Sequence, residues 1–529
     1  MSGAEGSLVT DCDYIVVGGG TAGCVLAARL SEDPGTRVLL LEAGSVEMVP
    51  AMMVPDAWPG LVGSAADWGG TTTAQADAGP LPYPRGRGLG GSGAINAMAH
   101  VRGHRAVYDA WAAGGAAGWG YADLLPYFKR SEHTEGRDPA LRGTGGPVRV
   151  APVPETSRHP AAVALAGALC ALGCPATGDL SGRRQEGVAW PDLAIWDGRR
   201  VSPADAYLLP AMHRPNLTVL GGCLVARLLI QGGRCTGAAY LRDGVPQQVH
   251  ASAEVIVCAG AIGSPQLLML SGIGPAGHLR AVGIDPVADL PGAGANLQDH
   301  PLAMACYASA VPLPRSRYNH GETYSTLPSP LAGAWPDLQV FPILLPVAPP
   351  GLQAPGGGFA LVASAVAPDS RGQVRLASAS PLDAPLTDPG LLREPGDAER
   401  LEAGLAMIRQ AAAGVAFARL GVTEIHPGPG VDGGGLRAWI RRTVSSYYHP
   451  AGTCRIGPGT DPGAVVDPEL RVHGVTGLRV ADASVIPVIP NAHPNATVLA
   501  IAERAADLIA GQRSRSAHPP RPQHAATDK

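Results

Sequence analysis

Residues Asp13–Gly23 read DYIVVGGGTAG, and this stretch decides the fold. An apolar run with strand character leads directly into the triplet Gly18-x-Gly20-x-x-Gly23. An alanine-rich helical pattern follows, and a second apolar run, Val38–Leu41, ends in Glu42. This order of strand, glycine triplet, helix, strand and acid is typical of a βαβ unit that binds a dinucleotide. The pattern by itself does not distinguish FAD from NAD.

Each part of this unit has a physical role. Gly18 allows a tight turn, Gly20 lets the backbone approach a pyrophosphate, and Gly23 lets the helix pack closely on the strand. The helix N-terminus presents free N–H groups and a positive dipole end to the phosphates. Glu42 has the spacing expected of an acceptor for the ribose hydroxyls. A structural glycine-rich turn is the alternative, and the complete order of elements argues against it.

Length and composition exclude several classes of protein. A chain of 529 residues is expected to form roughly two to four domain-sized units. The formal net charge of −4 and the lack of a basic tract argue against a nucleic-acid partner. No apolar run approaches the ~20 residues that span a bilayer, so we expect no transmembrane segment.

The cysteines indicate a reducing environment. Nine are scattered without a C-x-x-C pair, and no His/Cys cluster has the spacing of a metal site, so no metal is expected. Residues 1–10 lack the basic and apolar regions of a signal peptide. These features predict a cytoplasmic protein with reduced thiols.

Several later segments extend the nucleotide-binding sheet. Their patterns predict an α/β, Rossmann-like domain assembled from discontinuous pieces of the chain. The expected elements are a β-meander over 217–220, 224–230 and 235–241, a buried strand over 254–261, a helix over 264–271 with Pro265 in its first turn, a strand over 478–482, and a final helix over 497–510.

Residues of about 305–420 differ in character. Proline-rich loops interrupt apolar strands such as 338–341 and 359–362, which indicates an antiparallel sheet in a separate α+β substrate-binding domain. Residues 157–172 and 398–412 read as amphipathic helices. The expected domains are a nucleotide-binding domain of residues 1–155, 206–304 and 468–513, a substrate-binding domain of 156–205 and 305–467, and a disordered tail of 514–529.

A second glycine-rich segment lies over residues 84–98, PRGRGLGGSGAINAM. So many glycines before an apolar helical stretch suggest backbone that lies against a flat ligand. A flexible surface loop is the alternative, but Leu89 and the apolar positions from Ile95 to Met98 argue against it.

Four blocks of the chain together resemble the glucose–methanol–choline (GMC) family of FAD oxidoreductases. They span nearly the whole chain in the family's order. The blocks are the Gly18–Glu42 unit, the segment 84–103, the segment 260–275 (GAIGSPQLLMLSGIGP) with 296–301 (NLQDHP), and the segment 449–455 (HPAGTCR) with 491–497 (NAHPNAT). The segment 84–103 resembles the family's first signature, and 260–275 resembles its second signature.

The resemblance implies FAD as the cofactor and assigns residues to it. Gly18, Gly20 and Gly23 would hold the pyrophosphate and Glu42 the adenosine ribose. The other implied contacts are Gly91, Ser92, Asn96 and Met98 along the isoalloxazine and ribityl region, the Val225 backbone at the adenine, Asp482 and Ala483 at the ribityl–phosphate, and Asn495 and Thr497 near the pyrimidine edge.

Two positions depart from the family pattern. Some relatives attach FAD through a histidine just before the asparagine of the first signature, where this chain has Ile95. Isoleucine cannot form that bond, so we expect non-covalent FAD. Ser92-Gly93 also replaces a pair of serines common in relatives.

The reaction needs a base, because an alcohol is too weak an acid to ionise alone near neutral pH. Histidine is the natural choice. The resemblance implies His449 as the base and His493 as its hydrogen-bonding partner. The alternatives are that the two roles are exchanged, or that one histidine only packs. His100, His104 and His300 are candidates by proximity alone, with His300 read as structural, and Cys454 is read as a packing residue.

The sequence therefore predicts an FAD-dependent oxidoreductase that oxidises the CH–OH group of a small-molecule alcohol, with hydride transfer to flavin N5. Oxygen or another acceptor would reoxidise the flavin. A hydroxynitrile-lyase-like enzyme, a photodecarboxylase-like enzyme, and a flavin-free scaffold on the same fold are the alternatives.

Overall fold

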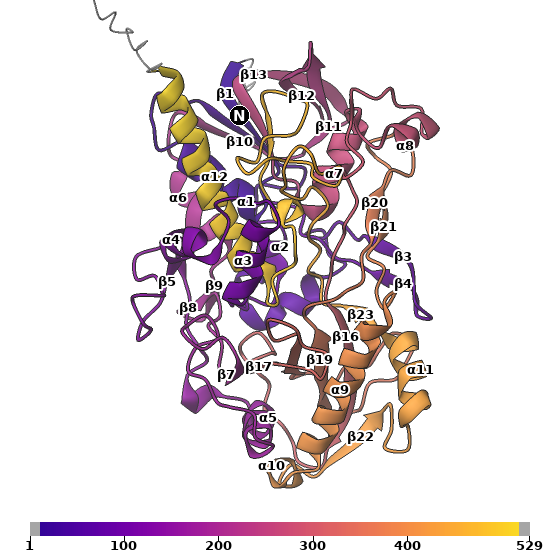
Figure 1. Cartoon of the computed structure of the whole chain (residues 1–529). Helices are drawn as coiled ribbons and strands as arrows, with labels where there is room; N and C mark the ends of the chain where they lie inside the picture. Colours follow the sequence, from indigo (N-terminus) through magenta and orange to yellow (C-terminus); the bar gives the residue numbers. More distant parts are fainter. Residues whose placement is uncertain (1–10, 518–529) are drawn as a thin grey trace, which may run out of the picture.

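The computed structural model describes residues 11–517, which form two seven-stranded sheets with helices around them (Figure 1). The final helix, α12 (Pro494–Ala517), extends beyond 513, so residues 514–517 are helical where a disordered tail was predicted. The remainder of that predicted tail, 518–529, lies outside the described residues.

The first sheet has a parallel centre. Val16 pairs with Leu40 on one side and with Ile256 on the other, and all three side chains are buried. Buried β-branched and leucine side chains on both faces are typical of a parallel sheet covered by helices. The parallel strands are β10 (Leu217–Leu220), β2 (Val38–Leu41), β1 (Asp11–Val17), β13 (Val245–Val257) and β24 (Leu478–Val480). The predicted α/β fold is thereby confirmed.

Strand β13 has two kinds of partner. Its first half pairs antiparallel with β12 (Arg234–Arg242), which pairs in turn with β11 (Cys223–Gln231). Its second half runs parallel to β1 and β24. The expected meander is therefore formed by β11, β12 and β13, whereas β10, predicted as its first strand, lies beside β2 instead.

The second sheet has the order β22-β16-β19-β18-β17-β7, and β23 also pairs with β16. All of these neighbours are antiparallel, as predicted for this region. The strands are β7 (Gly187–Ala189), β16 (Pro301–Ser309), β17 (Tyr324–Leu327), β18 (Leu338–Ile343), β19 (Gly358–Ala365), β22 (Val422–His426) and β23 (Ser445–Ser446).

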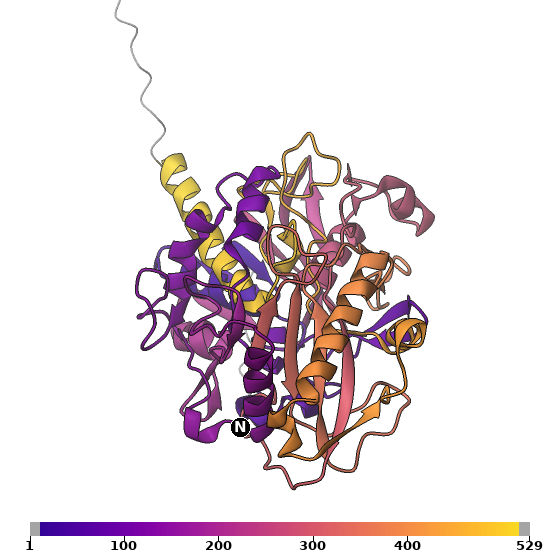
Figure 2. The same ribbon diagram turned by 60° about the horizontal axis from the view of Figure 1, so that its bottom comes forward.

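The two faces of this sheet have different partners. Helix α9 (Pro395–Ala412) lies across one face, as Figure 2 shows. Leu338 and Val340 of β18 pack there with Leu405. The alternate residues Gln339 and Phe341 project from the opposite face, because successive strand side chains alternate. That face looks towards the first sheet and carries the candidate site.

The helices match the sequence pattern in place but not always in extent. Helix α1 (Thr21–Leu30) and α5 (Pro160–Ala171) lie where they were expected. Helix α7 (Gly260–Leu270) begins four residues before the predicted start, so Pro265 lies inside the helix. Helix α12 packs against α1, where Arg29 and Glu503 form a salt bridge of 2.8 Å.

The remaining elements are short. The helices are α2 (Ser92–Ile95), α3 (Arg105–Ala113), α4 (Tyr121–Ser131), α6 (Leu209–Ala211), α8 (Ala276–Ala281), α10 (Val415–Ala418) and α11 (Gly433–Thr443). The helical turns are η1 (Pro50–Met53), η2 (Pro55–Leu61), η3 (Glu155–Ser157), η4 (Ala204–Leu208) and η5 (Ala483–Val485). The strand pairs are β3 (Thr71–Gln75)/β4 (Gly79–Pro82), β5 (Glu132–His133)/β6 (Val148–Arg149), β8 (Ile195–Trp196)/β9 (Arg199–Arg200), β14 (Ile273–Gly274)/β15 (Ala288–Asp289) and β20 (Gln373–Arg375)/β21 (Leu386–Asp388).

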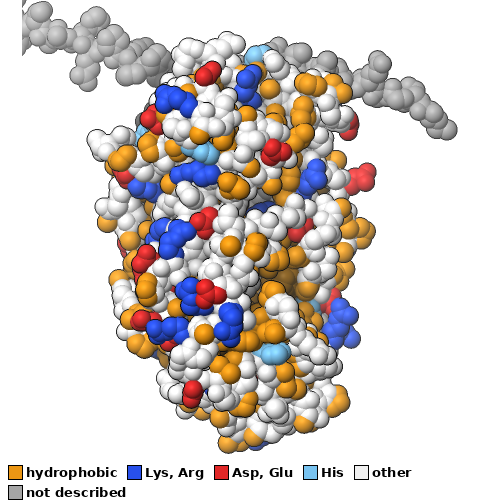
Figure 3. Space-filling view, turned by 90° about the vertical axis from the view of Figure 1, so that its right-hand side faces the viewer, with side chains coloured by type: hydrophobic (Ala, Val, Ile, Leu, Met, Phe, Trp, Pro, Cys, Tyr) orange, Lys and Arg blue, Asp and Glu red, His pale blue; other side chains and the backbone are white. Residues whose placement is uncertain are grey.

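The surface shows no segregation of charge on the face in Figure 3, where basic and acidic side chains are interspersed. Within residues 11–517, no helix has both the length and the apolar character needed to cross a membrane.

Candidate active site

The glycine triplet forms a close-packed turn between β1 and α1. A Cβ on Gly23 would lie 1.8 Å from the Gly18 carbonyl oxygen, so any side chain there would force the strand and helix apart. Gly20 is the N-cap of α1, which has no side-chain cap. The first N–H groups of a helix have no intrahelical acceptor, so this turn fits a pyrophosphate.

Glu42 connects this turn to two other loops. Its Oε2 accepts a hydrogen bond of 2.7 Å from the Gly19 N–H. Its Oε1 accepts hydrogen bonds from the N–H groups of Gly44 (2.7 Å) and Gly88 (3.0 Å). The side chain is only 6% exposed, and burial raises the pKa of its carboxyl group. The predicted ribose acceptor is therefore also a junction of three backbone segments.

The first signature lies directly against the triplet. The Gly90 N–H donates to the Gly19 carbonyl at 2.8 Å, and a Cβ on Gly91 would lie 2.7 Å from the Gly20 Cα. Ser92 Oγ accepts a hydrogen bond of 3.1 Å from the Gly86 N–H. This segment is thus an ordered part of the candidate cofactor site and not a flexible surface loop.

Asn96 and Met98 form the next part of this segment. Asn96 Oδ1 accepts hydrogen bonds from the Met98 N–H (2.9 Å) and from Arg200 Nη1 (2.8 Å), and Met98 has a φ of +57°. Arg200 is buried, and burial lowers its pKa to about 10. The sequence analysis missed Arg200, because nothing in its local pattern indicates a contact with residue 96.

Ile95 belongs to a small hydrophobic cluster. It packs there with Met52, Leu61, Ala66 and Ala94. The position that carries a linking histidine in some relatives is thus filled here by an apolar side chain in an apolar setting.

Asp482 explains why the second signature lies near the cofactor site. Its Oδ2 accepts hydrogen bonds from the Gly260 N–H (2.8 Å) and from Ser264 Oγ (2.5 Å) at the start of α7. Its Oδ1 accepts from the Ser484 N–H at 2.8 Å. Ala483 begins η5, and its carbonyl accepts a hydrogen bond from the Gly452 N–H at 3.1 Å. The segment after β24 therefore joins α7 to the loop that follows His449.

The N-terminus of α12 completes the cofactor residues at the end of the chain. Asn495 Oδ1 accepts a hydrogen bond of 2.9 Å from Thr21 Oγ1, which lies in the first turn of α1. Thr497 is buried with its hydroxyl 2.8 Å from Tyr108 Oη. Two helix N-termini thus meet, and their dipoles favour electron-rich groups there.

Val225 lies on β11, two residues from Cys223, whose N–H donates to the Glu42 carbonyl at 2.8 Å. The structure brings this strand to the end of β2. The glycine turn, the carboxylate and the two helix N-termini together fit FAD.

The predicted catalytic histidines lie together. The ring centroids of His449 and His493 are 5.1 Å apart at an interplanar angle of 72°. Tyr447 stacks on His449 at 4.3 Å, and Phe341 stacks on Tyr447 at 4.8 Å. Tyr324 contacts His493 edge-on at 5.0 Å. The two histidines therefore share one aromatic environment.

Each of the two histidines has one ring nitrogen engaged. His449 Nδ1 lies 3.0 Å from His300 Nδ1, and His493 Nε2 lies 3.0 Å from Tyr447 Oη. Tyr447 Oη also donates to Gln339 Oε1 at 3.0 Å. His493 Nδ1 is buried without a hydrogen-bond partner among residues 11–517. The nitrogens available to a substrate are thus Nε2 of His449 and Nδ1 of His493.

Burial keeps this cluster neutral. It lowers the pKa of His449 well below its usual value, and the neighbouring His493 and His300 add to the effect. It also lowers the pKa of His493 and of His300 to about 3. A neutral imidazole is the form that can accept a proton, so both predicted histidines are in the required state at neutral pH.

His300, which the sequence analysis read as structural, lies beside the predicted base. Its ring contacts His449 directly, and the preceding Asp299 bonds to the His449 backbone. The pattern NLQDHP carried a weak signal for this, because it brings a carboxylate and an imidazole side by side. The other two candidates by proximity lie elsewhere: His100 pairs with Glu132 at 3.1 Å, and His104 caps α3.

Cys454 is fully buried, and burial raises the pKa of its thiol. A thiol in this state is a packing group and not a nucleophile, in agreement with the sequence analysis.

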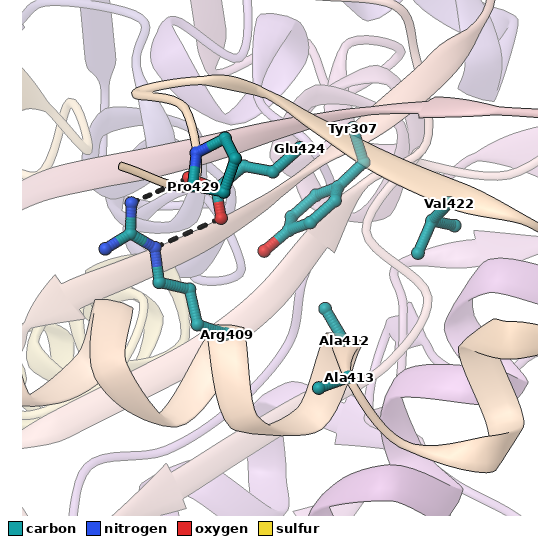
Figure 4. A pocket seen from close by; sticks show the side chains of 7 residues that line it. All are labelled: Tyr307, Arg409, Ala412, Ala413, Val422, Glu424 and Pro429. Atoms are coloured by element: carbon teal, nitrogen blue, oxygen red, sulfur yellow. Dashed lines mark hydrogen bonds and ion pairs between the residues drawn. The ribbon is translucent and has the colours of Figure 1, made fainter. Parts of the chain in front are cut away.

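A separate cavity of about 260 Å³ lies between α9 and β22 (Figure 4). Tyr307, which lines it, is six residues along β16 from Pro301, the residue that follows His300. At the usual strand rise this separation is about 20 Å, so the cavity lies at the far end of β16 from the histidines. Arg409 Nε and Nη2 bind Glu424 there, at 3.1 and 2.7 Å. Arg409 and Glu424 thus satisfy each other, whereas Tyr307 Oη is buried without a hydrogen bond of normal geometry among the described residues.

Comparisons with known proteins agree with this geometry. The family described as GMC oxidoreductase matches residues 12–302 with its N-terminal model and 368–502 with its C-terminal model. Human mitochondrial choline dehydrogenase is 38% identical over 94% of this chain and 90% of its own length. The oxygen-dependent choline dehydrogenase of Sinorhizobium medicae (strain WSM419) is 38% identical over 95% and 96%.

A solved structure shows the same architecture. Pyridoxine 4-oxidase from Mesorbium loti superposes with a TM-score of 0.89 at 36% identity, covering 96% of this chain and 99% of that chain. The chain belongs to the GMC family of FAD-dependent oxidoreductases, which act on CH–OH donors.

Proposed function

We propose that this enzyme oxidises the CH–OH group of a small-molecule alcohol, with His449 as the general base and His493 as the second group on the substrate oxygen. FAD, when bound, supplies the acceptor for the hydride at N5. The observation that carries the proposal is the pair of imidazoles, with ring centroids 5.1 Å apart, beside residues that fit FAD.

The geometry gives the two histidines different roles. His449 Nε2 is the open nitrogen of a ring held on its other side, so it can take the hydroxyl proton. His493 presents Nδ1 to the same oxygen. This nitrogen accepts a hydrogen bond while Tyr447 Oη donates to Gln339, and it can donate one only if Tyr447 Oη turns its proton to His493 Nε2. The aromatic rings of Tyr447, Phe341 and Tyr324 lower the local polarity, which strengthens both interactions.

The cofactor residues in this proposal are those that the resemblance implied. Gly18, Gly20 and Gly23 would hold the pyrophosphate and Glu42 the adenosine ribose. The segments around Asn96, Asp482 and Asn495 would hold the flavin half. We infer that FAD is bound non-covalently, because Ile95 stands where some relatives carry the linking histidine.

The names of the relatives favour a small polar alcohol as the substrate. Two of those described above are named choline dehydrogenases and one is named a pyridoxine 4-oxidase. All three names describe oxidation, so they lend no support to the lyase, photodecarboxylase or scaffold alternatives. Oxygen or another acceptor would reoxidise the flavin, and the scattered cysteines support a cytoplasmic location.

An anaerobic screen tests the proposal. The FAD-loaded enzyme is mixed with choline, pyridoxine, benzyl alcohol and short aliphatic alcohols, and flavin absorbance is followed. At least one alcohol should bleach the flavin, and the His449→Ala variant should bleach at least about 10²-fold more slowly with FAD still bound. Equal rates in the two proteins would refute the role of His449. Cleavage of a cyanohydrin without any bleaching would favour the lyase alternative.

A further inference from the structure

The dipeptide Asp299–His300 contacts His449 at two separate points. Asp299 Oδ1 accepts the backbone N–H of His449 at 2.8 Å and that of His300 at 2.8 Å. One carboxylate oxygen therefore ties the backbones of the two histidines together. The His300 ring then reaches His449 Nδ1 at 3.0 Å. Asp299 and His300 thus hold both the backbone and the ring of His449, the proposed base.

Asp299 is itself held firmly. Its Oδ2 accepts hydrogen bonds from Tyr83 Oη (2.7 Å) and Ser446 Oγ (2.5 Å), and the carboxylate is buried. Four donors around one acceptor-only group leave little freedom of rotation. Ser446 also accepts the Tyr448 N–H at 2.6 Å, so the turn before His449 is fixed as well.

The contact between the two rings has consequences for the tautomer. Two Nδ1 atoms 3.0 Å apart share one proton, so one nitrogen donates and the other accepts. His300 is fully buried, and the carbonyl groups of Pro490 and Val366 favour a proton on its ring. Its Nε2 is the nitrogen left for that proton, although Nε2 makes no hydrogen bond of normal geometry among the described residues. His300 Nδ1 is then the acceptor.

We propose that Asp299–His300 is the positioning element of the base. The Asp299 carboxylate fixes the backbone of His449, and His300 Nδ1 accepts the proton of His449 Nδ1. His449 is thereby locked as the tautomer whose Nε2 carries a lone pair towards the substrate. The inference rests on the proposed function and adds to it the reason that one particular nitrogen is basic.

The surrounding groups agree with a single shared proton between neutral rings. The groups that act on His449 are His493, His300 and Arg85, each of which opposes its protonation, and the stacked Tyr447 phenol, whose own pKa burial raises. No carboxylate faces the ring among these groups, since Asp299 meets the backbone of His449 and not its imidazole.

Three substitutions at His300 test the proposal. An asparagine amide can place its oxygen where Nδ1 of a histidine lies, whereas a glutamine amide reaches the position of Nε2. His300→Asn should therefore keep the acceptor for His449, while His300→Gln and His300→Leu should lose it. The measurement is the anaerobic rate of flavin reduction at saturating alcohol from pH 5 to 9, with bound FAD and thermal midpoint recorded for each protein.

We expect His300→Asn to reduce its flavin within about threefold of the wild-type rate. The pH at which this rate falls on the acid side should be unchanged. His300→Gln and His300→Leu should be slower by roughly 10²-fold, because a base in the wrong tautomer loses most of its effect. The rate of these two variants should also begin to fall at a lower pH than that of wild type. His300 is neutral between pH 5 and 9, so its removal takes away no positive charge and only leaves the His449 imidazolium without its acceptor.

Two results would overturn the proposal. One is an equal loss of the flavin-reduction rate in His300→Asn and His300→Gln with FAD bound, which would mean that the contact between the two rings serves packing alone. The other is wild-type behaviour of all three variants. If His300→Leu does not fold, the comparison of His300→Asn with His300→Gln still tests the proposal. A failure of the proposed function is distinct, since His449→Ala would then reduce its flavin as fast as wild type does.

Discussion

Replacing Glu42 by glutamine tests whether this carboxylate is a structural junction as well as a ribose acceptor. The carboxylate accepts three backbone N–H groups, from Gly19, Gly44 and Gly88. In the best orientation of the glutamine amide, its oxygen keeps the two donors at the Oε1 position. Its NH₂ group then faces the Gly19 N–H across 2.7 Å, which places two donors against each other.

The expected cost follows from these contacts. Loss of one hydrogen bond to a charged group costs about 1.5–3 kcal/mol, and the two retained bonds weaken because the acceptor becomes neutral. Burying a neutral amide instead of a carboxylate offsets part of this. The apoprotein should therefore lose about 2–4 kcal/mol of unfolding free energy, and loss of the ribose contact should weaken FAD binding by at least about tenfold.

Urea unfolding of the apoprotein measures the first effect, and quenching of flavin fluorescence on titration measures the second. Glu32→Gln is the matched control, because Glu32 lies in the same βαβ unit but is half-exposed and pairs with Arg29 at the surface. That control should change stability by less than about 0.5 kcal/mol. If the Glu42→Gln apoprotein unfolds at the same urea concentration as wild type, the junction has no energetic role and the reasoning is wrong.

Three further predictions concern the cofactor and the histidines. Acid precipitation should release all of the yellow colour into the supernatant, since Ile95 cannot link FAD; colour kept in the pellet would contradict this. His493→Asn should slow anaerobic flavin reduction less than His493→Gln, because the asparagine amide can take the place of the open Nδ1. The reverse order would show that Nδ1 is not the nitrogen that contacts the substrate oxygen. Because burial lowers the pKa of His449, the base stays neutral as the pH falls through 6.5, and the reduction rate should decline only below that value; a decline centred above pH 6.5 would show that another group titrates.

The sequence predicted the parts of the fold that depend on local pattern. The βαβ unit around Gly18 and Glu42 was predictable because strand, turn and helix chemistry all lie within 30 residues. The place of β10 was not, because its sequence suits either a meander or a parallel neighbour, and only packing beside Leu39 and Leu40 decides. The start of α7 was missed because a proline in a helix was taken to mark its first turn.

The site was predictable only to the level of residue type. His449 and His493 were proposed by resemblance, and the structure brings them together, but their catalytic roles stay predictions. Tyr447, Gln339 and Arg200 were missed because each acts through a contact more than 40 residues away in the sequence. No periodicity or spacing rule reports such a contact.

The last strand and helix of the chain have a consequence for biosynthesis. Strand β24 pairs with β13 in the first sheet, and α12 covers α1, yet both are made only after some 470 residues have left the ribosome. Until then the apolar face of α1 has no permanent cover, and such surfaces make partly made chains prone to aggregate. The enzyme cannot fold strictly from its N-terminus, so premature termination anywhere before α12 should yield a chain that neither binds FAD nor stays in solution.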